Sequence, residues 1–271
     1  MNITAILNAY DVPVTLDTLD SVRYHMTDQV LVLVDGVIWH SFDNVELPAY
    51  RLKGFNHGWY KSSYRNIILS LLTAYRNFPT TDWYCYLEHD CLITSSKFKK
   101  DLIEAEKHNI WCLGADFRRN QEVNLSYLEK IIKEELREQV YLLGVCVFYH
   151  KSFIKLAVEN EFFEKFLFYT NEFKNGFFPF YTAWDLTEHV LPSMVVHYGG
   201  AISQLAAFNE ECKKWTGNYR RYPIRYRPDI EYDTELFLQA SIVHPLKKYA
   251  DPIRDFHRAK RQKEEVNGNF R

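Results

Sequence analysis

The acidic pair Glu88 and Asp90 is the clearest sign of chemistry in this chain. The two carboxylates flank a histidine and follow residues 83–87, an aromatic and apolar run with the composition of a strand. Because side chains alternate along a strand, both carboxylates should lie on the same side of its carboxyl end, where a positive group must hold them together. A divalent cation is the candidate. In the alternative interpretation the acids are solvated or cap a helix that begins near Thr94.

Polar side chains also follow two other strand-like runs, residues 3–8 and 30–34. Asn8 and Tyr10 come at the end of the first run, and Asp35 follows the second. Ligands of open α/β sheets bind at the carboxyl ends of the strands, so we expect these residues to converge with the acidic pair. The chain has no GxGxxG and no GxxxxGK[ST]. The expected phosphate site is therefore a metal that bridges carboxylate and diphosphate, and hard oxygen ligands suit Mg²⁺ or Mn²⁺.

The elements that would position these residues alternate between strand composition and helical periodicity, which predicts an α/β fold. Apolar runs without polar alternation, such as residues 31–34, are typical of strands buried on both faces, as parallel sheets require. The predicted strands are 3–8, 30–34, 83–87, 110–114 and 140–149, and the predicted helices are 14–24, 62–75, 97–108 and 126–138.

Length and composition are those of a globular protein. The 271 residues suit one large domain or a domain with an appended lobe, with 47% hydrophobic and 25% charged residues. No apolar run is long enough to span a bilayer and the N-terminus has no basic signal region, so we expect a cytoplasmic protein. The five cysteines form no CxxC pair, which argues against a zinc site or a disulfide framework and predicts reduced, buried thiols.

Charge is distributed unevenly along the chain, although the net formal charge is only −2. Residues 213–271 hold 14 Lys and Arg against 8 Asp and Glu, so a basic tail follows an acidic body. We expect a core at 1–212 and a C-terminal extension at 213–271 that packs on the active site. A phosphate-bearing ligand or an anionic surface would suit the tail, and peripheral membrane contact stays open. No nucleic-acid partner is expected.

The order of these parts over residues 3–250 resembles that of the GT-A fold glycosyltransferases, and is most similar to their large family-2-like inverting group. These enzymes move a sugar from a nucleotide diphosphate donor. Where members have Val-Asp-Asp-Gly-Ser, this chain has Val-Asp-Gly at 34–36, and where they have Ala-Arg-Asn, it has Tyr-Arg-Asn at 64–66. The resemblance implies a Rossmann-like, mixed, mostly parallel sheet flanked by helices. It also implies that Asn8, Tyr10, Asp35 and Arg65 bind the nucleotide, with Tyr10 stacking on the base and Asp35 accepting a ring N–H.

The acidic pair is similar to the DxD element of that family in an ExD form. This likeness places Glu88 near the ribose and Asp90 on the metal. His244 and the lysines after it resemble the late segment that returns a histidine to the metal and a lysine to the diphosphate. His244 would then ligate Mn²⁺ or Mg²⁺, and Lys247 or Lys248 would offset charge on the leaving phosphate. A structural histidine before a proline is the alternative.

A second acidic pair, Asp185 and Glu188, follows the aromatic loop at 175–181. Three residues apart on a helix, the two acids share a face. The likeness to the family implies that one of them is the base on the acceptor side. In the alternative interpretation Thr182 caps the helix and Asp185 completes the cap. The sequence does not choose between the two acids.

Together these expectations describe a metal-dependent, hexosyltransferase-like enzyme. It would move a sugar from a UDP donor, in preference to a GDP donor, to a hydroxyl of a glycan or another acceptor. Whether the anomeric centre inverts stays open. A nucleotidyltransferase that makes nucleotide sugars is a rival, although residues 8–14 lack the Gly-rich loop and basic residue usual there. A noncatalytic module that binds a glycan or a partner is the other alternative.

Overall fold

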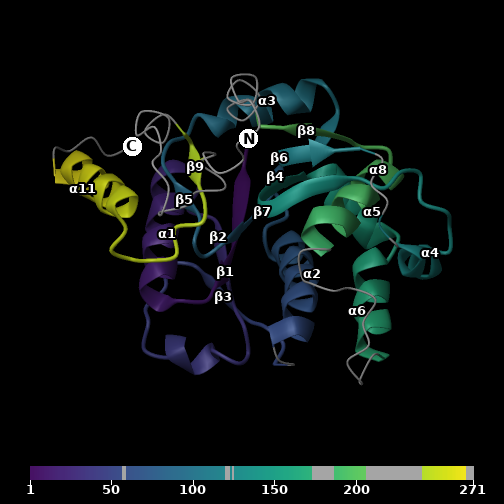
Figure 1. Ribbon diagram of the computed structural model, residues 1–271, viewed down its shortest axis with the longest axis horizontal. Helices are drawn as coiled ribbons and strands as arrows, with labels where there is room; N and C mark the ends of the chain where they lie inside the picture. Colours follow the sequence, from purple (N-terminus) through teal and green to yellow (C-terminus); the bar gives the residue numbers. More distant parts are fainter. Residues whose placement is uncertain (57–58, 120–122, 124, 173–185, 206–239, 267–271) are drawn as a thin grey trace.

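The protein has an α/β fold built on a mixed, mostly parallel sheet, as the sequence predicts (Figure 1). The fold comes from a computed structural model that describes residues 1–56, 59–119, 123, 125–172, 186–205 and 240–266. In this part of the chain the main sheet has seven strands in the order β3-β2-β1-β4-β7-β6-β8. They are β1 (Ile3–Ala9), β2 (Val30–Val34), β3 (Tyr50–Lys53), β4 (Trp83–Glu88), β6 (Ile110–Arg118), β7 (Tyr141–His150) and β8 (Ala201–Gln204).

Strand direction places several strand ends at one edge of the sheet. β1 runs parallel to β2 and β4, β2 to β3, and β6 to β8, while β7 is antiparallel to both of its neighbours, β4 and β6. Since β7 runs the other way, its first residues lie where β4 and β6 end, and Ala115 of β6 pairs with Leu143 of β7. The carboxyl ends of β1, β2, β4 and β6 and the start of β7 therefore share one edge.

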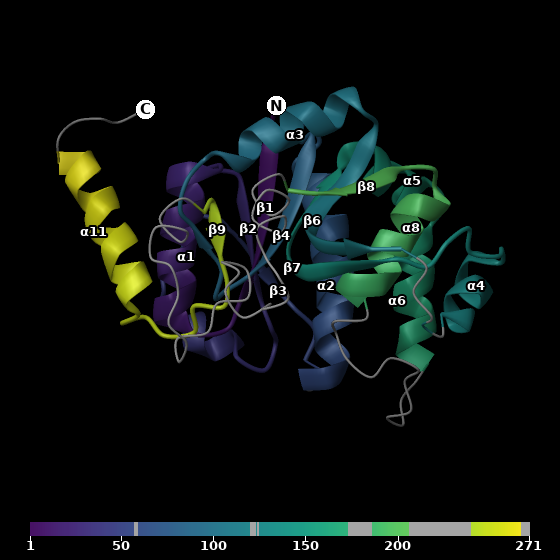
Figure 2. The same ribbon diagram turned by 45° about the horizontal axis from the view of Figure 1, so that its top comes forward.

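Helices cover both faces of the sheet (Figure 2). Apolar residues of α1 and α3 pack on one face, and those of α2, α4, α5, α6 and α8 pack on the other. β2 shows why its sequence is apolar throughout: Leu31 and Leu33 face one core, whereas Val30, Val32 and Val34 face the other. The helices are α1 (Val12–His25), α2 (Trp59–Asn77), α3 (Phe98–Lys107), α4 (Ser126–Ile132), α5 (Lys151–Glu159), α6 (Phe162–Glu172), α8 (Leu191–His197) and α11 (Pro252–Val266), with the short turns η1 (Trp39–Phe42) and η2 (Leu186–Val190).

The predicted helix at 126–138 is too long. α4 ends at Ile132 because Lys133 adopts the left-handed conformation, with φ of 60°, and its N–H returns to the carbonyl of Glu129. The chain then leaves the helix, and the Leu136 N–H donates to the Glu129 carboxylate (3.3 Å). Helical periodicity continued past this point in the sequence, but the cap ends the helix.

Four short strands have no counterpart in the sequence prediction. β3 and β8 are the two edges of the main sheet, and β5 (Leu92–Ile93) pairs antiparallel with β9 (Ile242–Val243) in a separate small sheet. Two-residue strands carry almost no pattern of their own, so the partner that they meet in the folded chain decides them.

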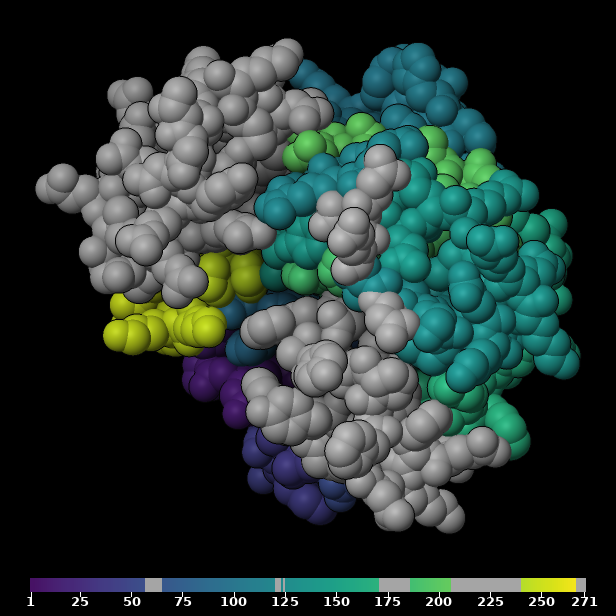
Figure 3. All heavy atoms as spheres, turned by 45° about the vertical axis from the view of Figure 1, so that its right-hand side comes forward, coloured from purple at the N-terminus to yellow at the C-terminus, as the bar shows by residue number. Residues whose placement is uncertain are grey.

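The described end of the chain packs on its beginning. β9 pairs with β5, and α11 lies against α1 on the side of the molecule away from α4 (Figures 1 and 2). The space-filling view likewise shows C-terminal residues, in yellow, on the same side as N-terminal residues, in purple (Figure 3). The predicted domain boundary between residues 212 and 213 lies outside the described residues.

Two further sequence expectations concern the thiols and the membrane. Cys85, Cys91, Cys112 and Cys146 are free and buried, as predicted, and Cys212 lies outside the described residues. None of the helices in the described ranges combines the length and the apolar character needed to cross a bilayer.

Candidate functional site

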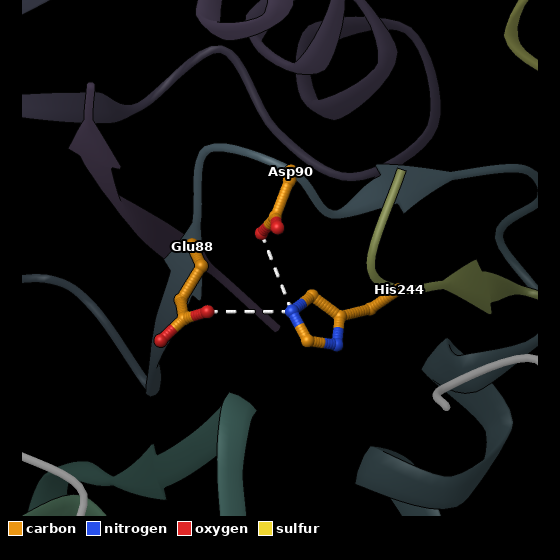
Figure 4. A group of neighbouring side chains, drawn as sticks. All are labelled: Glu88, Asp90 and His244. Atoms are coloured by element: carbon orange, nitrogen blue, oxygen red, sulfur yellow. Dashed lines mark hydrogen bonds and ion pairs between the residues drawn. The ribbon is translucent and has the colours of Figure 1, made fainter. Parts of the chain in front are cut away.

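Three side chains that could hold a metal meet at the shared edge of the sheet. Glu88 ends β4, Asp90 follows it by two residues, and His244 comes from the segment after β9; all three point toward one another (Figure 4). The His244 Nε2 atom lies 3.3 Å from Glu88 Oε2 and 3.3 Å from Asp90 Oδ1. One ligand atom from each residue lies within 4.8 Å of the others. Asp90 and His244 are thus neighbours in space although 154 positions separate them in the sequence.

Backbone hydrogen bonds fix the segment that carries His244. On one side of it, the Thr94 N–H donates to the Ser241 carbonyl (2.9 Å) within the β5–β9 pairing. On the other side, the Leu246 N–H donates to the Asp90 carbonyl (2.8 Å). Because bonds flank His244 on both sides, the position of its ring relative to Asp90 is set by backbone rather than by side-chain rotamers alone.

The electrostatics of this trio favour a positive charge between the acids. Burial opposes a charge on the imidazole, but the carboxylates of Asp90 and Glu88 outweigh it and raise the pKa of His244 to about 9. Burial likewise raises the pKa of Asp90, yet the adjacent His244 and the charges of His89 and Lys247 lower it overall. A proton on His244 therefore supplies the cation that the two carboxylates require.

The donor set fits a divalent metal. Asp90 Oδ1 is buried and, among the described residues, accepts no well-directed hydrogen bond, although His244 lies within ion-pair distance. Two carboxylates and an imidazole are ligands that Mn²⁺ accepts, and carboxylates suit Mg²⁺. A metal would replace the proton on His244, since imidazole ligates in its neutral form.

Asp35 is held at the same edge by contacts that the sequence did not reveal. Its Oδ1 accepts the N–H of Val37 (2.8 Å), and its Oδ2 accepts the side-chain amide of Asn66 (2.9 Å). Asn66 is buried, and its own oxygen accepts the N–H of Phe55 (2.6 Å). Gly54 allows this approach, because a β-carbon there would lie 2.7 Å from Asn66 Nδ2. Asn66 therefore connects β2 and the segment after β3 to α2.

Asn8 lies near the end of β1 and Tyr10 follows this strand, between the ends of β2 and β4. Tyr10 is 56% exposed, and its ring centroid lies 5.4 Å from that of His89. Asn8 pairs with Glu88 in the β1–β4 register, and its amide donates to the Tyr86 hydroxyl (3.4 Å). Both residues border the acidic pair, and their roles stay predictions.

The three basic residues predicted to bind the nucleotide differ in burial. Arg65 is buried, and its guanidinium carbon lies 4.3 Å from the centroid of the Phe55 ring. Lys247 and Lys248 are exposed just beyond His244. The two lysines are thus exposed to solvent, whereas the Arg65 side chain packs on Phe55.

Glu188 lies on the other side of β4, against β7. The π-helical turn η2 presses on Gly144, whose N–H donates to Glu188 Oε1 (3.5 Å). A β-carbon at Gly144 would lie 2.1 Å from Thr187 Oγ1 and 3.1 Å from Glu188 Cγ, so only glycine permits this contact. β7 begins at the shared edge and Gly144 is its fourth residue, so Glu188 lies near that edge. Asp185, Thr182 and the loop at 175–181 lie outside the described residues.

Comparisons with known proteins concern the fold. No family model and no curated protein matches the chain. Among solved structures, a glycosyltransferase involved in glycosylation of the major capsid of PBCV-1 matches with a TM-score of 0.50 at 13% identity, over 96% of this chain and 100% of that one. TarS residues 1–349 of S. aureus matches with a TM-score of 0.43 at 14% identity, over 76% and 58%. The strand order and the full-length match to the PBCV-1 glycosyltransferase agree, and the chain has a GT-A-like α/β fold.

Proposed function

We propose that this protein is a metal-dependent glycosyltransferase that moves a sugar from a nucleoside diphosphate sugar to a hydroxyl acceptor, with UDP preferred over GDP. The observation that carries the proposal is the meeting of Glu88, Asp90 and His244 at the edge where β1 and β2 also end. A fold alone hosts many functions, so the proposal rests on this site.

The donor side would stabilise the leaving group. Breaking the anomeric bond builds negative charge on the diphosphate, and interactions that strengthen with this charge accelerate the reaction. Asp90 and His244 would hold Mn²⁺ or Mg²⁺, which supplies Lewis-acid stabilisation of the diphosphate when bound. Glu88 would lie toward the ribose, and the exposed ammonium groups of Lys247 and Lys248 would add positive charge at the mouth of the site.

Asp35 supports a preference for UDP or GDP over ADP. A fixed carboxylate accepts an N–H, which uracil and guanine rings offer and the N1 atom of adenine does not. The Asn66 amide and the Val37 N–H hold the Asp35 carboxylate in one orientation. Tyr10, exposed beside it at the end of β1, supplies a ring on which the base would stack.

The acceptor side needs a group that takes the proton of the attacking hydroxyl. Glu188 is the described candidate, because it reaches the shared edge from η2 and contacts the Gly144 amide. Asp185 is the second candidate from the sequence. Assignment of either as the base presumes inversion at the anomeric centre.

The test is a binding and turnover screen of the purified protein. Calorimetry with UDP, GDP and ADP, each with and without Mn²⁺, should give the tightest binding for UDP with Mn²⁺ and weak binding of ADP. Release of UDP from UDP-sugars, followed by a coupled assay, should depend on the metal. Equal binding of the three nucleotides would contradict the role of Asp35, and formation of a nucleotide sugar from a sugar phosphate and a nucleoside triphosphate would show a nucleotidyltransferase instead.

A further inference from the structure

Arg254 of α11 is a completely buried arginine that touches three separate segments of the chain. Its Nη1 forms an ion pair with Asp17 Oδ2 on α1 (2.7 Å), and its Nε donates to the Leu246 carbonyl (3.0 Å). Its Nη2 lies 3.2 Å from the Thr18 hydroxyl and 3.4 Å from the Cys91 carbonyl. A planar guanidinium offers five N–H donors in a fixed fork, so one side chain can serve all of these acceptors at once.

Two of these three segments carry the candidate metal ligands. Cys91 directly follows Asp90, and Leu246 lies two residues after His244. The Thr18 hydroxyl also lies 2.5 Å from the His89 carbonyl, so the backbone is held on both sides of Asp90. The guanidinium of Arg254 thus binds the backbone next to Asp90 and the backbone next to His244.

The Asp17 carboxylate that pairs with Arg254 also pairs with two other arginines of α11. Asp17 is buried, and its Oδ1 lies 2.6 Å from Nη2 of Arg261 and 3.5 Å from Nη1 of Arg258. The three arginines, spaced four and three residues apart, line one face of α11. Within the described part of the chain, Arg261 hydrogen-bonds to Asp17, whereas Arg254 also binds the carbonyls of Leu246 and Cys91 beside the candidate metal ligands.

We propose that Arg254 is a positioning residue for the metal centre: it sets the separation of Asp90 and His244 by holding the carbonyls of Cys91 and Leu246. This inference rests on the proposed metal-dependent function. The C-terminal part of the chain then contributes to the site in two ways. It brings His244 and the lysines to the donor, and Arg254 of α11 holds the backbone that carries the metal ligands. Buried partners behind metal ligands orient them, and their loss commonly weakens metal affinity by roughly 10- to 100-fold.

The test compares Arg254→Lys with Arg261→Lys in the full chain. Both changes keep a cation near Asp17 on the same helix, but a lysine at 254 lacks the fork that serves Leu246 and Cys91 together. We expect both variants to lose thermal stability, while only Arg254→Lys weakens Mn²⁺ binding, by about tenfold or more in calorimetry. In metal-free protein, hydrogen exchange at the amides of Leu246 and Thr94 should be faster in Arg254→Lys than in Arg261→Lys.

Thr18→Val provides a second variant in case Arg254→Lys does not fold. It removes the hydroxyl between Arg254 and the acidic loop, leaves the ion pair with Asp17, and should weaken Mn²⁺ binding in the same direction. Mn²⁺ affinity of Arg254→Lys, or of Thr18→Val in its place, within twofold of that of Arg261→Lys would overturn the positioning role. If wild-type protein bound Mn²⁺ and these variants bound it equally well, only this inference would fail. If wild-type protein bound no Mn²⁺, the proposed function would fail and the positioning role with it.

Discussion

The two sides of the sheet edge are built differently. On the proposed donor side, at the ends of β1, β2 and β4, a hydrogen bond joins Asn66 to Asp35, and ion pairs join His244 to Glu88 and Asp90. On the proposed acceptor side, at β6, β7 and η2, the π-helical turn that carries Glu188 approaches the backbone of Gly144 closely. The first side thus relies on paired charges, whereas the second depends on a backbone approach that only glycine allows.

This difference indicates a division of labour. A diphosphate and a cation need fixed ligands, so the donor side should govern affinity for nucleotide and metal. A base for an incoming hydroxyl acts only in the transition state, so the acceptor side should govern turnover. Variants on the two sides should therefore separate into changes of Kd and changes of kcat.

The largest effect should come from Asp90→Asn on the donor side. Loss of this carboxylate removes a direct ligand, so Mn²⁺-dependent UDP binding should fall by more than the roughly 100-fold typical of an outer partner. Calorimetry with Mn²⁺ and UDP measures it, and circular dichroism checks the fold. Asp28→Asn is the matched control, because that carboxylate is exposed and forms an ion pair with Arg23 at the surface. Unchanged affinity in Asp90→Asn would remove the metal from the proposal.

Glu188→Gln should have the next largest effect, and on kcat alone. A positioned general base contributes about 10²- to 10⁴-fold, so we expect kcat to fall by roughly 100-fold or more while the Kd for UDP with Mn²⁺ is unchanged. Steady-state turnover of a UDP-sugar measures kcat, and Glu159→Gln, an exposed helix carboxylate, is the control. A weaker Kd with unchanged kcat would place Glu188 on the donor side and end the division of labour.

Asn66→Ala should weaken UDP binding by about tenfold, with a smaller effect on kcat. The change leaves the Phe55 N–H and the Asp35 carboxylate without their shared partner, so the carboxylate loses its fixed orientation. Calorimetry should also show a smaller difference in affinity between UDP and ADP in the variant than in the wild type. Asn77→Ala, an exposed position near the end of α2, should change neither value. Retention of the full preference for UDP in Asn66→Ala would contradict the role of Asp35.

The smallest effect concerns acid stability of the α1–α11 contact on the donor side. Burial, with the charges of Arg261 and Lys260 nearby, lowers the pKa of His25 and His257 to about 4. Between pH 6.5 and 4.5 the unfolded chain takes up protons at these groups and the folded chain does not, so the free energy of unfolding falls as pH falls. We expect a loss of about 1 kcal/mol in total, allowing for solvent screening.

Urea unfolding of wild type and His257→Gln at pH 6.5 and 4.5 measures this effect. The loss between the two pH values should be smaller in the variant, because glutamine has no proton to take up. His40→Gln is the control, since that ring is largely exposed on η1. An equal loss in His257→Gln and wild type would show that His257 is protonated in the folded protein.

Much of the core and one half of the site follow from the sequence alone. A strand buried on both faces has no polar positions, so β2 is recognisable from its sequence, as is β4, which ends at Glu88 two residues before Asp90. The place of Asn8, Asp35 and Asp90 at one edge follows from the rule that parallel strands end together. These inferences depend only on local pattern and on the direction of neighbouring strands, which the sequence carries.

The tertiary structure decided what depends on distant neighbours. The Ser-Ile-Val-His-Pro-Leu-Lys run at 241–247 suggested His244, but only the β5–β9 pairing and the Leu246 bond to Asp90 place its ring on the acids. No sequence pattern distinguishes Asn66 from any other helix asparagine, or Gly144 from any other strand glycine. The burial of Arg254 against Asp17 likewise joins residues 237 positions apart. A contact of this kind is set by how two helices pack, and that packing depends on the whole core rather than on either helix.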